Sequence, residues 1–227
     1  MQIVEPIRDR GMVAKIGDYL RRWDKRYFLM FEFGIYTGLR ISDILALTYG
    51  DIIEQYTSGR RRWKEHIERH EIKTGRRRLI PLRDTSLGNL IARELKPITQ
   101  WDLNEPIFLS ARRGPDGSRH AIGRWQAYHV LRQAARQCGV LGHVGTHTLR
   151  KTFGYHVYQR TRDVAQLQAL FGHTSQAITL RYIGVSQDTH DAAYRVLNFD
   201  GRIGTEKTAK DAPQKTGKQL RIRDELY

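Results

Sequence analysis

The sequence predicts a mainly helical α+β fold with a small antiparallel sheet near residues 51–82, and two patterns lead to that prediction. Apolar residues recur at helical spacing over much of the chain, first between residues 18 and 36. Between residues 61 and 82 the pattern changes to two extended stretches, WKEHIERHEI and RRRLIPL, around the turn KTG. Two extended stretches joined by a short turn that contains glycine are typical of a β-hairpin.

The helices are predicted in order along the chain. The first covers residues 18–36 and ends near Gly38, because glycine commonly closes helices. A short second helix follows, with Ser42 and Asp43 suited to its first turn by capping and by the helix dipole. Arg40 lies at the junction of these two helices. Further helices are predicted over residues 86–95, 123–138, 146–158 and 164–170.

Composition predicts one folded domain followed by a tail. A chain of 227 residues with 40% hydrophobic residues can bury one sizeable core. We assign residues 1–199 to this domain, in which residues 190–199 could form a helix that packs on its own core or on a neighbouring subunit. Residues 200–227 are polar, charged and nearly free of large apolar side chains, which is typical of a flexible basic tail.

The charge of the chain points to a polyanionic partner. Lys and Arg outnumber Asp and Glu by 39 to 24, which gives a formal net charge of +15 and a pI near 10.2. Such a chain attracts nucleic acid through the release of counterions. Ribosomal and chromatin proteins are equally basic, so charge alone does not separate an enzyme from a passive binder.

Several other classes are disfavoured by what the sequence contains. The N-terminal segment carries charges throughout and has no long apolar run, so we predict neither a secretory signal nor a membrane span. We therefore expect a cytoplasmic, nucleoid-associated protein. The single cysteine, Cys138, excludes an intramolecular disulfide and a cysteine-based zinc cluster, and we expect a buried structural thiol. His143 and His147 lack an HExxH pattern, and no GxxxxGK[ST] loop or acidic cluster suggests ATP or magnesium, so we predict no cofactor and no metal.

The segment THTLRKTFG, residues 146–154, is the clearest candidate for chemistry. Thr146 can cap a helix, which would place His147 and Arg150 three residues apart on one helical face. An imidazole beside a guanidinium suits a phosphate, because arginine binds two oxygens in a fork and histidine can move a proton near pH 7. The alternative is a pair on the surface without a function.

Five further residues are weaker candidates when each is taken singly. In TGLRISDIL, Arg40 lies between two apolar helices, where Asp43 could orient it or simply form an interhelical ion pair with it. Lys73 lies at the hairpin tip beside a run of arginines, which is typical of a solvated face. His173 follows a glycine that would close a helix, at an exposed corner. Tyr182 also fits an ordinary half-buried aromatic residue.

Taken together, the motifs resemble those of the catalytic domain of tyrosine recombinases, the phage-type integrases, over roughly residues 10–197. The motifs follow in the order TGLRISDIL, IKTGRRRLIPL, HTLRKTFG, LFGHTS and ITLRYIG. The resemblance implies a site-specific recombinase that cleaves and rejoins DNA through a covalent 3′-phosphotyrosyl intermediate, in integration, excision or inversion. It also implies one active site, which would contain Arg40, Lys73, His147, Arg150, His173 and the nucleophile Tyr182.

Chemistry suggests a role for each side chain of that site. Arg40 and Arg150 suit the two non-bridging oxygens of a phosphodiester, and His173 can add a hydrogen bond that strengthens as charge develops. The attacking phenol has an unperturbed pKa of about 10 and needs a base, for which His147 is the candidate. Lys73 suits protonation of the departing 5′ oxygen, as the resemblance also implies.

The partners expected from the resemblance are double-stranded DNA and further copies of the chain, as a tetramer on paired sites. The family usually carries a helical DNA-clamping domain before the catalytic one, and too few residues precede Arg40 to form it. We therefore expect a short form of the family, whose grip on DNA comes from an accessory DNA-binding protein or from the tail. Two alternatives stay open: a type IB topoisomerase, which relaxes DNA without exchanging partner strands, and a catalytically silent DNA-binding regulator on the same scaffold.

Overall fold

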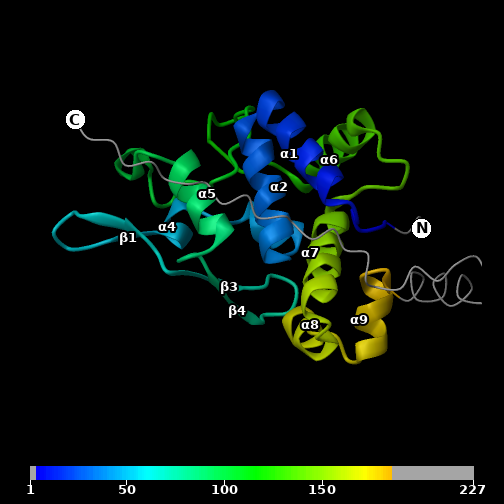
Figure 1. The fold of residues 1–227 in the computed structure, drawn as a ribbon. Coiled ribbons are helices and arrows are strands. Elements are labelled where there is room, and N and C mark those ends of the chain that lie inside the picture. Colours follow the sequence, from blue (N-terminus) through cyan, green and yellow to red (C-terminus); the bar gives the residue numbers. More distant parts are fainter. Residues whose placement is uncertain (1–3, 186–227) are drawn as a thin grey trace, which may run out of the picture. The chain divides into compact units, whose positions relative to one another are not determined.

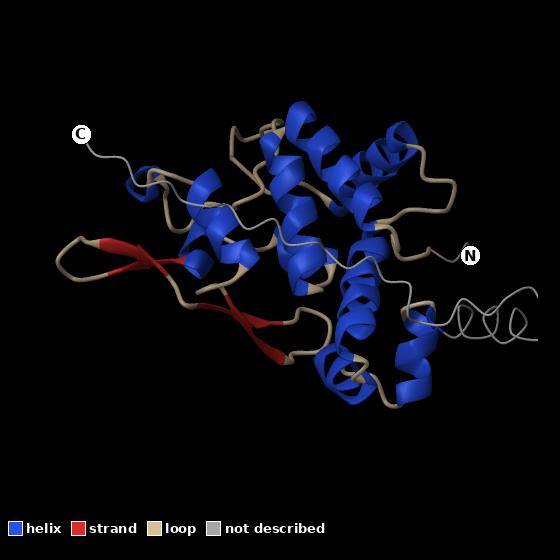
Figure 2. Cartoon of the chain, viewed as in Figure 1, coloured by secondary structure: helices blue, strands red, loops and turns tan. Residues whose placement is uncertain are grey.

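The computed structural model describes residues 4–185, which form helices with two β-ribbons between α4 and α5 (Figures 1 and 2). The mainly helical fold predicted from the sequence is confirmed. The helices are α1 (Arg10–Trp23), α2 (Lys25–Thr37), α3 (Ile41–Leu45), α4 (Tyr49–Ile52), α5 (Ser86–Glu94), the 3-10 helix η1 (Ile98–Gln100), α6 (Arg124–Cys138), α7 (Thr146–Thr161), α8 (Val164–Phe171) and α9 (Gln176–Tyr182).

The single helix predicted over residues 18–36 is wrong, because the chain breaks at Asp24 into α1 and α2. Asp24 has an extended backbone, with φ −160° and ψ 126°, and its N–H still donates to the carbonyl of Leu20 at 2.8 Å. Its carboxylate accepts a hydrogen bond from the backbone N–H of Arg26, also at 2.8 Å. One aspartate thus closes the first helix and caps the second, which lets the two helices pack against each other.

Two antiparallel ribbons form the β-structure, instead of one hairpin spanning residues 61–82. Strands β1 (Ile53–Gln55) and β2 (Arg61–Trp63) form the first ribbon. Strands β3 (His66–His70) and β4 (Arg77–Pro81) form the second, which confirms the predicted hairpin around KTG. Lys73 lies in the turn of this second ribbon, which reaches toward α7 and α8 (Figure 1).

Helix α2 lies at the centre of the described helices, with α1, α5, α6 and α7 packed around it (Figure 1). Its side chains are buried on several sides, including Phe28, Met30, Phe31 and Phe33. Burial of each such side chain stabilises the fold by roughly 1.5–3 kcal/mol before entropy is counted. Helix α2 ends at Gly38, as predicted, where φ is +62°. The rigid centre therefore sets the position of the loop that carries Arg40.

The contact between α2 and α7 depends on Gly34, so we expect Gly34→Ala to destabilise the fold. A Cβ atom at Gly34 would lie 2.8 Å from the Cβ atom of Leu149 in α7. The overlap is expected to lower the free energy of unfolding by about 1–3 kcal/mol, measured by urea denaturation. Gly142→Ala is the matched control, since a Cβ atom there meets nothing within 4 Å. Equal stability of the two variants would contradict this packing.

Three other sequence predictions concern the cysteine, membrane-spanning helices and the C-terminal residues. Cys138 is buried at the end of α6, as expected of a structural thiol. In the described residues, no helix is both long and apolar enough to cross a membrane. The helix predicted over residues 190–199 and the tail predicted over residues 200–227 lie outside the described residues.

Candidate active site

The first turn of α7 carries His147 and, one turn later, Arg150. Thr146 was predicted to cap this helix, but it is the first helical residue, and Gly145 takes the cap position. The backbone N–H of Gly145 donates to the hydroxyl of Thr148 at 3.1 Å, and the N–H of Thr148 donates to the carbonyl of Gly145 at 3.0 Å. This reciprocal pair satisfies hydrogen-bonding groups at the start of the helix. Because His147 and Arg150 are three residues apart in the helix, their side chains point to the same side.

Arg150 is held at the base of the site by backbone carbonyls. Its side chain is 3% exposed, which excludes the alternative of a surface pair. One guanidinium nitrogen donates to the carbonyl of Gly38 at 2.6 Å, and the other donates to the carbonyl of Phe171 at 3.2 Å. The guanidinium carbon also lies 4.5 Å from the centre of the Phe171 ring. Arg150 therefore joins the end of α2 to the end of α8.

Arg40 precedes α3 and forms an ion pair with Glu71 instead of Asp43. The guanidinium of Arg40 donates to the carboxylate of Glu71, which follows β3. Asp43 is fully buried, and one of its carboxylate oxygens accepts a hydrogen bond from the backbone N–H of Ile72 at 2.7 Å. The expectation that Asp43 orients Arg40 by a salt bridge is therefore wrong. Asp43 holds the backbone next to Lys73, because its carboxylate reaches across to the β3–β4 turn.

Tyr182 is the last residue of α9, and its hydroxyl faces the start of α7. The hydroxyl oxygen lies 3.5 Å from Nδ1 of His147. Burial raises the pKa of the phenol above its usual value of 10, and the charges of Arg150 and Arg40, which act to lower it, do not cancel that rise. The ring is enclosed by Phe171, at 5.5 Å between centroids, and by Nζ of Lys151, 5.2 Å from its centre.

His173 lies in the loop between α8 and α9, where Gly172 ends α8 with φ at +70° and Ser175 caps α9. Both ends agree with the sequence prediction, but His173 is partly buried and not at an exposed corner. Its Nδ1 lies 3.0 Å from the hydroxyl of Thr179, and its ring centre lies 5.1 Å from that of Tyr182. The imidazole is thus held beside the phenol.

One cavity of about 370 Å³ brings four of the six predicted residues together, namely Arg40, Lys73, His147 and Arg150. Tyr182 joins them through its contact with His147, and the ring of His173 lies beside that of Tyr182. Arg124, the first residue of α6, also lines this cavity. The site is therefore assembled from the starts of α3, α6 and α7, the β3–β4 turn and the end of α9.

The cations of the site affect the titration of both histidines. Burial lowers the pKa of His147 below 6.5, and the charges of Arg150 and Arg40 lower it further. Burial and the same two arginines lower the pKa of His173. Both shifts favour the neutral imidazole at pH 7 in the DNA-free protein, so His147 can accept a proton there.

Three charged residues of this site were missed in the sequence, and one of them, Arg124, lines the cavity. Glu71, 2% exposed, accepts hydrogen bonds from Arg40 and Arg150, and Lys151, 8% exposed, lies against the ring of Tyr182. Lys151 follows Arg150 directly in the segment THTLRKTFG, and this position is the signal that could have found it. No signal in the sequence marks Glu71, because the segment before it, HIERH, is rich in charged and polar residues, as is typical of an exposed strand.

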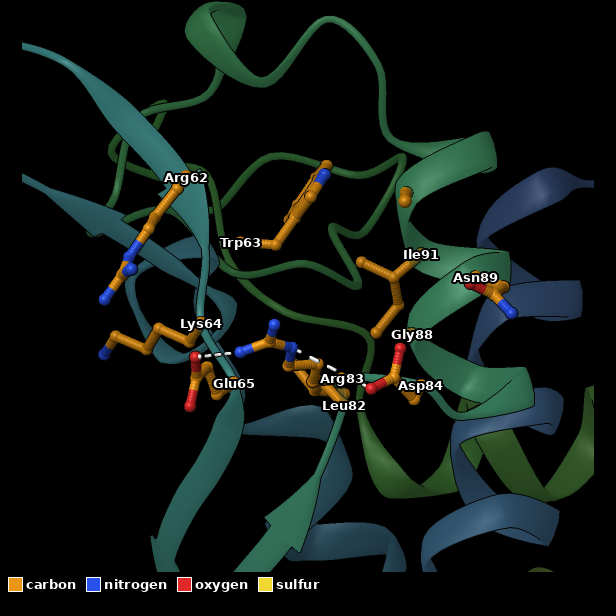
Figure 3. Close-up of a pocket in the computed structure, with 11 residues that line it drawn as sticks. Arg62, Trp63, Lys64, Glu65, Leu82, Arg83, Asp84, Gly88, Asn89 and Ile91 are labelled. Atoms are coloured by element: carbon orange, nitrogen blue, oxygen red, sulfur yellow. Dashed lines mark hydrogen bonds and ion pairs between the residues drawn. The ribbon is translucent and has the colours of Figure 1, made fainter.

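A second cavity, of about 380 Å³, lies between β2, the segment that follows it and α5 (Figure 3). There Arg83 contacts Glu65 at 2.8 Å and Asp84 at 3.8 Å. The lining residues include Trp63 and Ile91 and none of the residues predicted to carry chemistry. Both arginines that line it, Arg62 and Arg83, are paired with carboxylates, so the cavity of Arg40 and Arg150 remains the candidate active site.

Comparison with known proteins gives matches over most of the chain. The model of the phage integrase family matches residues 12–188. The chain is 44% identical over 197 residues to the probable integrase/recombinase YoeC of Bacillus subtilis, which covers 87% of this chain and 98% of YoeC. It is 26% identical over 163 residues to the tyrosine recombinase XerD of Corynebacterium glutamicum, which covers 70% of this chain and 48% of XerD. The chain thus spans nearly all of one relative and about half of the other.

Solved structures share the fold at low sequence identity. The XerA recombinase matches with a TM-score of 0.62 and 18% identity, over 86% of this chain and 65% of XerA. The catalytic domain of bacteriophage HP1 integrase matches with a TM-score of 0.52 and 17% identity, over 85% of this chain and 95% of that domain. Together with the family match and the identity to YoeC, the shared fold shows that the chain belongs to the phage integrase family of tyrosine recombinases.

Proposed function

We propose that this chain cleaves and rejoins double-stranded DNA, with Tyr182 as the nucleophile that becomes linked to a 3′ phosphate. One observation carries the proposal. The hydroxyl of Tyr182 lies 3.5 Å from Nδ1 of His147, whose lowered pKa favours the neutral imidazole, and the charge of Arg150 acts to lower the pKa of the phenol. A phenol placed between a base and a cation that can hold phosphate is the arrangement that nucleophilic attack on a phosphodiester requires.

The proposed reaction exchanges one ester for another. The hydroxyl oxygen of Tyr182 attacks phosphorus and its proton passes to Nδ1 of His147, while the bond from phosphorus to the 5′ oxygen breaks. Lys73 supplies the proton that the departing 5′ oxygen takes up. The reverse attack, by a 5′ hydroxyl on the phosphotyrosyl ester, releases Tyr182 and restores the DNA strand. The phosphotyrosyl linkage conserves the ester, so no high-energy cofactor enters the balance.

Arg40 and Arg150 are proposed to bind the non-bridging oxygens. Arg150 is fixed by two carbonyls, so its guanidinium needs no reorganisation when charge develops. Arg40 is 21% exposed and faces the cavity, where a phosphate can reach it. His173 is proposed to add a third contact to the phosphate through Nε2, because its Nδ1 is engaged with the hydroxyl of Thr179 at 3.0 Å.

The proposed substrate and assembly follow from charge and from the relatives. A net charge of +15 favours DNA, and two structural neighbours are XerH bound to its difH substrate and a lambda integrase tetramer bound to a Holliday junction. We propose that four copies of this chain act on paired DNA sites, with strand exchange between them. If this chain alone does not bind its DNA target stably, we propose that an accessory DNA-binding protein assists it.

The test uses a pool of partly randomised duplexes that carry 5′-bridging phosphorothiolates. Cleavage of such a duplex releases a thiol, which reseals the strand poorly, so the covalent adduct accumulates. We expect an adduct that survives denaturation, and the trapped duplexes then supply a defined substrate. DNA binding without any adduct would contradict the proposal and favour a silent regulator. Relaxation of plasmid DNA without recombinant products from paired sites would favour a topoisomerase.

The proton-accepting role of His147 predicts how cleavage depends on pH. A base works only when it is neutral, so kcat/KM is expected to fall as the pH drops through the pKa of His147. Because burial and the neighbouring arginines lower that pKa below 6.5, the fall is expected on the acid side of pH 6.5. Single-turnover cleavage at subsaturating protein concentration, between about pH 5 and pH 8, measures it.

Two variants separate this effect from others. His147→Gln is expected to cleave slowly and to lose the acid limb, while His66→Gln, which changes an exposed histidine in β3, keeps it. An acid limb centred above pH 6.5, or one that persists unchanged in His147→Gln, would show that another group is the base.

A further inference from the structure

Glu71 is a buried carboxylate that four side chains surround. Its side chain is 1% exposed, and burial of a charge is costly unless partners compensate for it. One carboxylate oxygen accepts hydrogen bonds from the guanidinium of Arg40 and from the hydroxyl of Thr74, the latter at 2.8 Å. The other accepts from Arg150 at 3.4 Å and lies 3.5 Å from the guanidinium of Arg78. Both oxygens are thus fully used.

These partners belong to parts of the chain that are far apart in sequence. Arg40 lies 31 residues before Glu71, and Arg150 lies 79 residues after it. Thr74 is the neighbour of Lys73 in the β3–β4 turn. The backbone N–H groups of Thr74 and Gly75 also donate to the carbonyl of Glu71, at 3.3 and 2.8 Å. Glu71 therefore contacts the phosphate-binding arginines on one side and the lysine-bearing turn on the other.

The charges explain why an anion is needed at this point. Arg78 and Arg150 are nearly buried, and each lies beside further cations. Burial lowers the pKa of Arg78, and repulsion by Arg150 lowers it further. Burial alone would raise the pKa of Glu71, but hydrogen bonds from Thr74 and Arg40 and the charge of Arg150 hold it below its usual value. An ionised Glu71 offsets the repulsion and leaves the cluster with an excess of positive charge for a phosphate.

The geometry points to Glu71 as a positioning residue that holds Arg40, Arg150 and the Lys73 turn in a single arrangement. This inference rests on the proposed cleavage reaction, and it adds a residue whose effect is transmitted through others. Glu71 does not line the cavity, so it acts on the phosphate through the arginines and on the leaving group through Thr74. These two routes of action, the arginine arm and the Thr74 arm, can be tested separately, because Thr74 belongs only to the second.

The leaving group distinguishes the two arms. An alkoxide needs a proton as it departs, whereas a thiolate departs easily, since a thiol has a pKa of only about 8.5. A defect in the placement of Lys73 should therefore slow cleavage of an ordinary phosphodiester and spare a 5′-bridging phosphorothiolate. A defect in the arginines should slow both, because both substrates place the same negative charge on the non-bridging oxygens.

The experiment measures single-turnover cleavage of the trapped duplex in both chemical forms by the full-length chain. Thr74→Val keeps the side-chain shape and removes the hydroxyl, and it should slow the phosphodiester by at least about tenfold and the phosphorothiolate very little. Glu71→Gln should slow both forms, by about 10²-fold on the phosphodiester. Lys73→Ala is the benchmark for a pure leaving-group defect. Glu68→Gln is the matched control, since Glu68 pairs with Arg77 on the exposed face of the same ribbon and should leave both rates unchanged.

Several outcomes would overturn the inference. Wild-type rates for Glu71→Gln on both substrates would do so, as would a Thr74→Val defect of equal size on the two. If Glu71→Gln fails to fold, as its urea denaturation would show, Thr74→Val alone decides, because its change is isosteric. Absence of any adduct with the wild-type chain is a different result, which contradicts the proposed function and this inference with it.

Discussion

Tyr182→Phe is expected to form no covalent adduct and to cleave DNA at least about 10⁴-fold more slowly than the wild type, because the variant lacks the attacking oxygen. Its fold should be unchanged. The ring contacts with Phe171, His173 and Lys151 involve only carbon atoms of the tyrosine, and phenylalanine keeps them. Gel-shift affinity for the trapped duplex is expected to stay close to that of the wild type, since the arginines proposed to bind phosphate are intact.

The matched control for this variant is Tyr36→Phe. Tyr36 lies near the end of α2 and is 44% exposed, so the loss of its hydroxyl should change neither cleavage nor stability. Residual cleavage by Tyr182→Phe near the wild-type rate would show that another group attacks the phosphate. A loss of activity in both variants would point to a general effect on the fold.

Arg150 substitutions are expected to have the second largest effect, and to act on both activity and stability. Arg150→Ala leaves the carbonyls of Gly38 and Phe171 without their donor in a buried place, which should lower the free energy of unfolding by about 1–3 kcal/mol. Cleavage should fall by about 10²–10³-fold, because a preorganised donor to the developing charge is lost. Urea denaturation and single-turnover cleavage measure the two effects.

Arg150→Lys separates charge from geometry. Lysine keeps the positive charge but cannot donate to two carbonyls and a phosphate in the planar fork of a guanidinium. Cleavage by this variant should therefore stay far below that of the wild type. The control Arg77→Ala removes an exposed arginine that pairs with Glu68, and it should leave cleavage and stability little changed. Full activity in Arg150→Lys would show that charge alone suffices at this position.

The helices were largely predictable because their apolar periodicity is local. The predicted helices over residues 86–95, 123–138 and 164–170 agree with α5, α6 and α8 within a residue at each end. The break at Asp24 was missed, because the apolar spacing continues across it and only the side-chain cap on Arg26 interrupts the helix. Local pattern thus identifies helical segments more reliably than it locates their ends.

The site was predictable where its residues lie in recognisable motifs, and not where it depends on tertiary contacts. The order of five motifs led to Arg40, His147, Arg150 and Tyr182, which the fold brings together. No pattern in EIKTG shows that the carboxylate of Glu71 turns inward to meet cations 31 and 79 residues away. The same limit explains Asp43, whose spacing from Arg40 suggested an ion pair although its partner is the backbone of Ile72.

The site of covalent attachment tests the central claim most directly. The adduct trapped with the phosphorothiolate duplex would be digested with protease and nuclease, and the nucleotide-bearing peptide would be identified by mass spectrometry. The account predicts a phosphonucleotide on Tyr182, in the peptide that contains the end of α9. Attachment to any other residue, or an adduct that persists in Tyr182→Phe, would contradict it.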